Sequence, residues 1–206
     1  MGTVTSLENH RLARRRRVEE VHRLLPRATL FFDLRSPYTY LLAERADRLF
    51  DGLEWRPASA DILHGSELDA DAPRAAADRA RLLGLPLVWP EDRPYRVLHA
   101  MRVASLAAER GCGGAFVVAA SRLAFCGGFD IDDPEILGEA AAAAGLALED
   151  ALHAAGDVAR DGPIEDAART LLAAGAQRLP ALKVGRTLFC GEERLMEAAA
   201  AARAAV

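Results

Sequence analysis

Lysine and asparagine are almost absent from this sequence, in which Lys183 is the only lysine and Asn9 the only asparagine among 206 residues. An active site built from this chain therefore has few amine and amide side chains to use, and its cations are mainly arginines. Long apolar runs are missing as well. No stretch approaches the roughly 20 apolar residues that a membrane-spanning helix needs, so we expect no transmembrane segment.

Cysteine is also scarce. Cys112, Cys126 and Cys190 are odd in number and widely spaced, and no two of them form a C-x-x-C pair. This pattern argues against a disulfide framework and indicates reduced thiols, which predicts a cytoplasmic protein. No metal site is predicted, because His99 and His153 have no second ligand at metal-binding spacing.

Positive charge is in deficit overall and is concentrated at one end. The chain carries a formal net charge of −4 at pH 7. Residues 1–27 hold seven arginines and three glutamates, a net charge of +4, so the rest of the chain carries −8. An acidic body offers no general basic surface to nucleic acid. No apolar segment follows the arginine run, so residues 1–28 are not expected to be a secretion signal. They are expected to form a basic arm, either simply solvated or bound to an anionic partner.

The body of the chain opens with a β-α-β pattern. An apolar and aromatic run at 29–34 has strand character. Ser36 suits a helix N-cap and Pro37 the first helical position, where a missing N–H costs nothing. Apolar residues then recur at helical spacing as far as Phe50, and residues 53–57 are predicted to form a second strand.

The middle of the chain is expected to be helical, and the end returns to strands. Residues 61–161 contain no convincing strand pair. Helices are predicted at 74–83, 95–110, 115–126, 134–144 and 148–159. A further helix begins at Gly162-Pro163, two strands flank the hairpin signal Gly185-Arg186, and a last helix follows Gly191. The fold class is therefore α/β: a thioredoxin-like domain (29–60 and 162–206) with an inserted all-helical domain (61–161).

In a thioredoxin-type fold the reactive group lies at the start of the first helix, near the turn before the third strand. A helix N-terminus favours an anion and lowers the pKa of a thiol. Ser36 and Thr39 occupy the places where a redox protein has its two cysteines. Ser36 either only caps the helix or donates a hydrogen bond to the thiolate of a ligand. The second place is the Leu179-Pro180 bond, which is expected to be cis.

Four segments in chain order carry a family resemblance. They are Phe31–Leu41, Leu83–Pro90, Gly128–Pro134, and the stretch from Leu179-Pro180 to Leu195, in which Glu193 replaces an aspartate. Together they resemble the 2-hydroxychromene-2-carboxylate isomerases and kappa-class glutathione transferases of the DsbA-like superfamily. The resemblance covers residues 29–200 and implies a thioredoxin-like fold with an inserted helical domain.

The resemblance also implies a function, that of a glutathione-dependent isomerase or transferase acting on a small-molecule electrophile. Its cofactor would be glutathione or another low-molecular-weight thiol, held as thiolate by Ser36. The Leu179 backbone, before Pro180, would pair with the cysteinyl part, and the helix start at Glu192 and Glu193 would receive the γ-glutamyl end. The substrate pocket is expected to include Pro37, Tyr38, His64, Pro86 and Trp89.

One departure from the family bears on the substrate. The isomerases carry a lysine and an asparagine after the second strand, and the corresponding stretch, Ala60–Glu67, has neither. His64, Arg56 and Arg74 are candidates to replace them, although the sequence favours a solvated loop residue for His64, and Trp89 is equally compatible with a core residue. A non-catalytic DsbA-like binding protein without the C-x-x-C pair is the alternative function. Alanine-rich surfaces are compatible with a homodimer.

Overall fold

The computed structural model describes residues 28–46, 48–50, 52–64, 72–90 and 97–204. The predicted basic arm therefore lies outside the described residues, apart from Ala28. No helix within the described ranges is both long enough and apolar enough to cross a membrane.

A four-stranded mixed sheet in the order β2-β1-β3-β4 forms the centre of the molecule. β1 (Ala28–Phe32) pairs in parallel with β2 (Leu53–Pro57) and antiparallel with β3 (Ala181–Val184). β3 continues through Gly185, at φ 58°, into the antiparallel β4 (Thr187–Cys190). A left-handed residue at this point is what a two-residue hairpin requires, and the predicted hairpin is confirmed.

Helices cover both faces of the sheet because alternate residues of each strand point to opposite sides. Leu30 and Phe32 of β1 pack in the main core, which also contains buried residues of α2 (Pro37–Ala46) and α10 (Leu195–Ala204). Phe31 points the other way, into a smaller cluster with α9 (Asp161–Ala173) and the short α3 (Ala60–His64). The sequence did not predict α3, since five residues are too few for a helical period.

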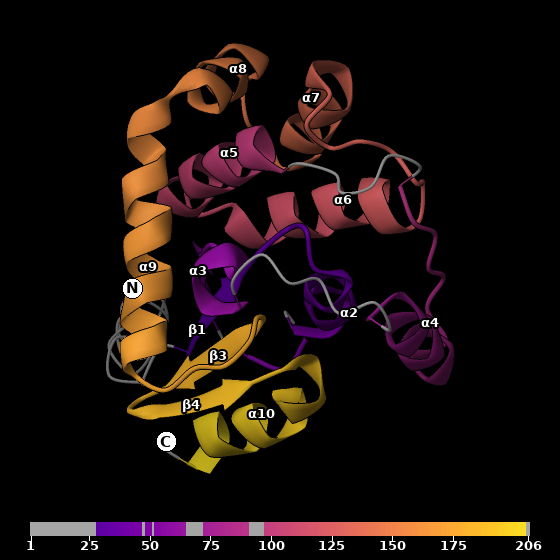
Figure 1. Cartoon of the computed structure of the whole chain (residues 1–206). Coiled ribbons are helices and arrows are strands. Elements are labelled where there is room, and N and C mark those ends of the chain that lie inside the picture. Colours follow the sequence, from indigo (N-terminus) through magenta and orange to yellow (C-terminus); the bar gives the residue numbers. More distant parts are fainter. Residues whose placement is uncertain (1–27, 47, 51, 65–71, 91–96, 205–206) are drawn as a thin grey trace, which may run out of the picture.

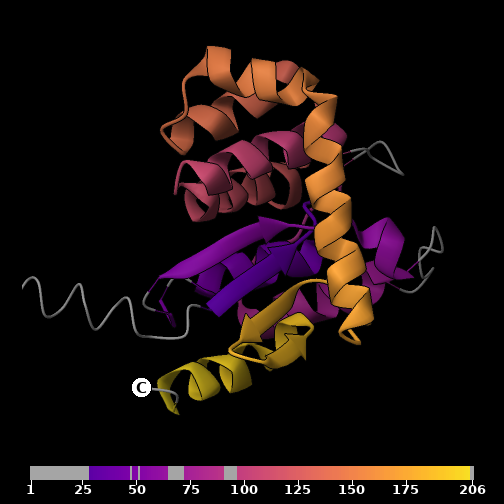
Figure 2. The same cartoon turned by 90° about the vertical axis from the view of Figure 1, so that its left-hand side faces the viewer.

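Four of the remaining helices form a layer beyond the β2 edge (Figures 1 and 2). This layer contains α5 (Leu98–Glu109), α6 (Gly113–Phe125), α7 (Pro134–Ala143) and α8 (Leu148–Gly156). α9 runs from the layer along one side of the sheet (Figure 2). α4 (Ala72–Leu83) lies apart from the layer, against α2 (Figure 1).

The observed order of elements is the predicted one. The five predicted helices between residues 74 and 159 correspond to α4 to α8, with ends that differ by a few residues. Asp133 caps α7 by accepting hydrogen bonds from the backbone N–H groups of Glu135 and Ile136, and Pro134 takes the first helical position. The predicted α/β fold class, with a thioredoxin-like order of strands and helices, is confirmed.

Candidate functional site

Ser36 lies in the turn between β1 and α2, directly before the first residue of the helix. Its backbone N–H donates to the Asp33 carbonyl at 3.1 Å, and its carbonyl accepts from Thr39 N–H at 3.0 Å. The side chain is half-buried. Within the described part of the chain the Ser36 hydroxyl has no hydrogen-bond partner, so it does not act as a side-chain cap of α2.

The position of the second cysteine in a C-x-x-C protein is taken by a residue with a structural role. Thr39 is fully buried, and its hydroxyl donates to the Asp33 carbonyl at 2.8 Å. This bond ties the first turn of α2 to the end of β1. Thr39 therefore supports the position of Ser36 and has no free hydroxyl proton to offer a ligand.

Asp33 is a buried acid in the same turn that sequence reasoning missed. Its two carboxylate oxygens accept from Arg35 N–H at 2.8 Å and from Ala60 N–H, at the start of α3, at 2.9 Å. Burial raises the pKa of Asp33, while the Arg35 guanidinium and the two N–H donors oppose this rise. The signal in the sequence that could have indicated this role is an acidic residue directly after an apolar strand. Asp33 joins the turn of Ser36 to α3.

The Leu179-Pro180 peptide bond is cis, as the sequence predicted. Phe31 of β1 is paired with Ala181 of β3 in an antiparallel register, so the residues before Ala181 run alongside the residues that follow Phe31. The Leu179-Pro180 turn and the Ser36 turn thus lie at the same end of the sheet. The Pro180 carbonyl accepts from Gly191 N–H at 2.8 Å, which brings the residues after β4 to this end too.

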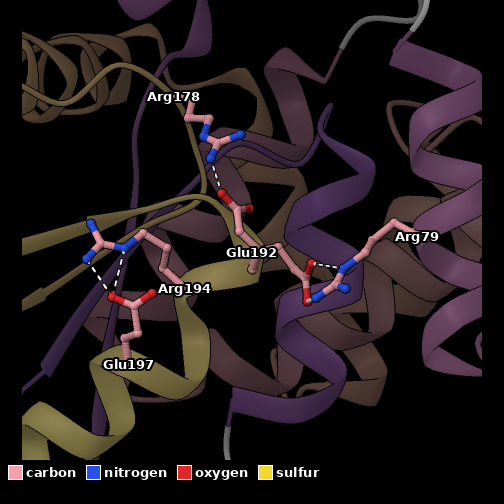
Figure 3. A network of polar contacts seen from close by, with 6 residues as sticks. Arg79, Arg178, Glu192, Arg194 and Glu197 are labelled. Carbon is pink, nitrogen blue, oxygen red and sulfur yellow. Dashed lines mark hydrogen bonds and ion pairs between the residues drawn. The ribbon is translucent and has the colours of Figure 1, made fainter.

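Glu192 and Glu193 follow Gly191 in a 3-10 turn before α10, and both side chains pair with arginines. Figure 3 shows Arg79 pointing toward Glu192. The Glu192 side chain is 1% exposed. It accepts from Arg45 of α2, and from Arg79 of α4 at 2.6 Å through Nε and 3.2 Å through Nη2. Glu193 is exposed and pairs with Arg178. The sequence suggested that these acids meet a ligand, and it did not indicate their arginine partners.

The predicted pocket residues lie in separate parts of the chain and differ in exposure. Pro37 is buried and Tyr38 half-buried in the first turn of α2, next to Ser36 in the chain. Pro86 is exposed, and Trp89 packs edge-on against Phe125 with ring centroids 5.9 Å apart. His64 is placed by its backbone at the end of α3.

None of the cysteines lies at the start of α2. Cys112, Cys126 and Cys190 are free and half-buried, and the Cys126 thiol donates to the Tyr40 hydroxyl at 3.2 Å. Burial and the Cys126 contact raise the pKa of Tyr40, so its phenol stays protonated. Among the residues that the structure describes, no group of three His, Cys, Asp or Glu side chains is arranged to hold a metal ion.

Comparison with solved structures finds 31 similar chains. A 2-hydroxychromene-2-carboxylate isomerase superposes with a TM-score of 0.64 at 17% identity, over 84% of this chain and 93% of its own. A probable DsbA oxidoreductase from Streptomyces coelicolor gives a TM-score of 0.67 at 20% identity, over 87% and 89%. The cytosolic disulfide reductase DsbM from Pseudomonas aeruginosa, in a structure with GSH, gives 0.57 at 18% identity, over 85% and 95%.

These identities are low, and the likeness is one of fold. Among curated protein sequences none matches this chain. The model of the DSBA-like thioredoxin domain matches residues 28–202, a range that contains every strand of the sheet and the whole of the site described above. The chain belongs to the DSBA-like thioredoxin domain family.

Proposed function

We propose that this protein is a glutathione-dependent isomerase or transferase in which Ser36 activates the thiol of bound glutathione. The observation that carries the proposal is the Ser36 hydroxyl at the N-terminus of α2, without a partner in the described chain, at the end of the sheet that holds the cis Leu179-Pro180 turn. A hydroxyl at this point has one proton to donate. In this proposal the anion that Ser36 receives is a thiolate.

Two effects would stabilise that thiolate. The hydroxyl donates a charge-assisted hydrogen bond to sulfur. The dipole of α2 adds the equivalent of about half a positive charge at its N-terminus. A free thiol has a pKa of about 8.5, so at neutral pH most of it is protonated. Lowering the pKa of the bound thiol by one unit corresponds to about 1.4 kcal/mol of preferential binding of the thiolate.

The reaction uses sulfur that the ligand brings. The thiolate adds to the electrophilic carbon of a conjugated enone, a C–S bond forms, and the π electrons move onto oxygen to give an enolate. Rotation about the former double bond follows, and the enolate re-forms that bond as it expels the thiolate. Protonation of the enolate carbon instead gives a stable conjugate, which is the transferase outcome. Neither route involves net oxidation.

The named neighbours are consistent with this chemistry and also with its redox relatives. One is an isomerase and another is a disulfide reductase in a structure with GSH. Disulfide exchange of the C-x-x-C type needs sulfur at positions 36 and 39, where this chain has serine and a threonine already bonded to the Asp33 carbonyl. We therefore favour a bound thiol as nucleophile over a protein disulfide.

The test is a pH titration of glutathione bound to the protein, with thiolate followed by its ultraviolet absorbance. We expect the thiol pKa to fall by at least about one unit on binding to the wild-type protein, and Ser36→Ala to remove most of that fall. Ser105→Ala, in α5 of the helical layer, removes an equivalent hydroxyl far along the chain and is the matched control. An unshifted thiol pKa in the wild-type complex would sink the proposal.

A second candidate is a thiol-binding protein without catalysis. It is favoured by the segment after β2, which enters α3 without the lysine or asparagine of the isomerases. Turnover separates the two candidates. Conjugated enones and activated aryl halides should react faster with glutathione in the presence of wild-type protein than with Ser36→Ala. Thiolate binding without any acceleration would establish the second candidate instead.

A further inference from the structure

Positive charge is in excess where α2, α4 and the turn after β4 meet. Within the part of the chain that the structure describes, Arg45, Arg79 and Arg178 pair with two carboxylates, those of Glu192 and Glu193. In the two ion pairs of Glu192, the acid is more buried than the arginines. The side chain of Glu192 is 1% exposed, whereas those of Arg45 and Arg79 are 27% and 32% exposed. The carboxylate is hidden beneath guanidinium groups that reach solvent.

The two arginines keep donors that Glu192 does not use. Glu192 accepts from Nη1 of Arg45 and from Nε and Nη2 of Arg79. A guanidinium offers five N–H bonds in a fixed planar fork. Within the described chain, Nε and Nη2 of Arg45 and Nη1 of Arg79 have no carboxylate partner. Glu192 thus holds both guanidinium groups in place and leaves three nitrogens available to an external acceptor.

This cluster lies within reach of a ligand held at Ser36. Glu192 directly follows Gly191, whose N–H donates to the carbonyl of Pro180 at 2.8 Å, so the backbone of Glu192 lies beside the cis turn at the Ser36 end of the sheet. Arg45 is nine residues along α2 from Ser36, about 13 Å at the helical rise. An extended tripeptide spans about 10 Å, and an arginine side chain covers the remainder.

We propose that Arg45 and Arg79, oriented by the buried Glu192, form a binding site for a carboxylate of the thiol ligand. The proposal rests on the proposed function, because it assumes a thiol ligand at Ser36. The sequence predicted that the helix start at Glu192 and Glu193 receives the γ-glutamyl end of glutathione, and it did not indicate these arginines. Arginine pairs of this kind recognise carboxylates through planar, charge-assisted hydrogen bonds. Glutathione has two carboxylates, and the experiment separates them.

The experiment is calorimetry with S-methylglutathione, whose sulfur does not ionise, and with its glycyl monoethyl ester and its diethyl ester. We expect the diethyl ester to bind wild-type protein at least about tenfold more weakly than the free acid, as loss of one charge-assisted hydrogen bond implies. The monoester assigns the site to the glycyl carboxylate if it binds as weakly as the diethyl ester. It assigns the site to the γ-glutamyl carboxylate if it binds as tightly as the acid.

Two variants of α4 test whether Arg79 causes the difference in affinity between the free acid and the diethyl ester. Arg79→Gln should weaken binding of the free acid about tenfold and reduce the acid-to-diester ratio to about threefold or less. Arg81→Gln removes the same charge from the same helix, two residues away and outside the cluster, and should leave the ratio unchanged. The wild-type ester series needs no variant, so it decides the proposal even if Arg79→Gln does not fold.

Two results would overturn the proposal: equal affinities of the acid and the diethyl ester for wild-type protein, or an unchanged ratio in folded Arg79→Gln. Failure of the proposed function is distinct from either. Ser36→Ala should bind S-methylglutathione within about twofold of wild type, because the thioether accepts no thiolate stabilisation. A normal ester series together with an unshifted glutathione thiol pKa would therefore retain the carboxylate site and reject thiol activation.

Discussion

At the scale of single residues, Asp33 is the group whose ionisation matters most to the Ser36 turn. Its carboxyl group is buried and accepts two backbone N–H groups, one of them at the start of α3. Burial raises its pKa in the folded state above the unfolded value of about 3.9. A raised pKa in an acid means that the folded protein binds the proton more tightly than the unfolded chain does.

Because the pKa of Asp33 is raised on folding, the effect of Asp33→Asn on the free energy of unfolding should depend on pH. The contribution of Asp33 to stability is complete below the unfolded pKa and declines as pH rises through the folded pKa. The free energy of unfolding of wild type minus that of Asp33→Asn should therefore be larger at pH 3 than at pH 7. Urea denaturation of both proteins across this range measures it. A difference that grows with pH would contradict the burial argument.

At the scale of elements, the buried Arg102 connects the helical layer to α9. Arg102 of α5 is 5% exposed, donates from Nε and Nη2 to Asp161 at 2.7 Å each, and donates from Nη1 to the Ala155 carbonyl at 3.0 Å. The bidentate pair orients the first turn of α9. The Arg102 hydrogen bond lowers the pKa of Asp161, which is the opposite direction from Asp33.

Asp161→Asn should therefore destabilise the protein most at neutral pH. Removal of one partner from a buried ion pair costs about 3–5 kcal/mol. We expect about 2 kcal/mol here, because the Asp161 side chain is 31% exposed. The cost should shrink as pH falls through the folded pKa of Asp161, since that carboxylate stabilises the fold only when ionised. Asp166→Asn, in an exposed pair on the same helix, is the control and should change little.

The elements that could be predicted are encoded by neighbouring residues in the sequence. The contacts that could not be predicted join residues far apart in the chain. Ser36-Pro37 predicts a helix start and Gly185 predicts a hairpin, each from a few neighbouring residues, and the structure has both. Glu192 meets partners 147 and 113 residues away in the chain, and no local pattern encodes such a meeting. The site was thus predicted in its backbone turns but not in the charges that surround it.

At the scale of the whole molecule, the helical layer docks on the sheet through a close approach at Gly113. A Cβ on Gly113, the first residue of α6, would lie 2.9 Å from Trp55 Cβ on β2 and 3.3 Å from Ala108 Cα. Neither atom belongs to the flexible end of a side chain. Glycine is needed here to let the backbone of α6 reach the edge of the sheet.

Gly113→Ala should accordingly lower the free energy of unfolding by about 1–3 kcal/mol, the usual cost of overpacking. Gly156→Ala is the matched comparison, because a Cβ there meets nothing within 4 Å and the residue ends α8. That variant should be neutral or stabilising by up to about 1 kcal/mol through helix propensity. Thermal or urea unfolding of the pair measures both, and equal effects would show that the packing at Trp55 relaxes freely.

The lack of sulfur at positions 36 and 39 has a consequence for the response of this protein to oxidation. In a C-x-x-C protein an oxidant converts the two thiols to a disulfide, which must be reduced before the protein can react again. Under the proposed function the thiol is a dissociable ligand, so an oxidant would act on the surrounding pool of small thiols and leave the turn unmodified. Activity would follow the occupancy of the site, falling as that pool is oxidised and returning as soon as reduced thiol is resupplied.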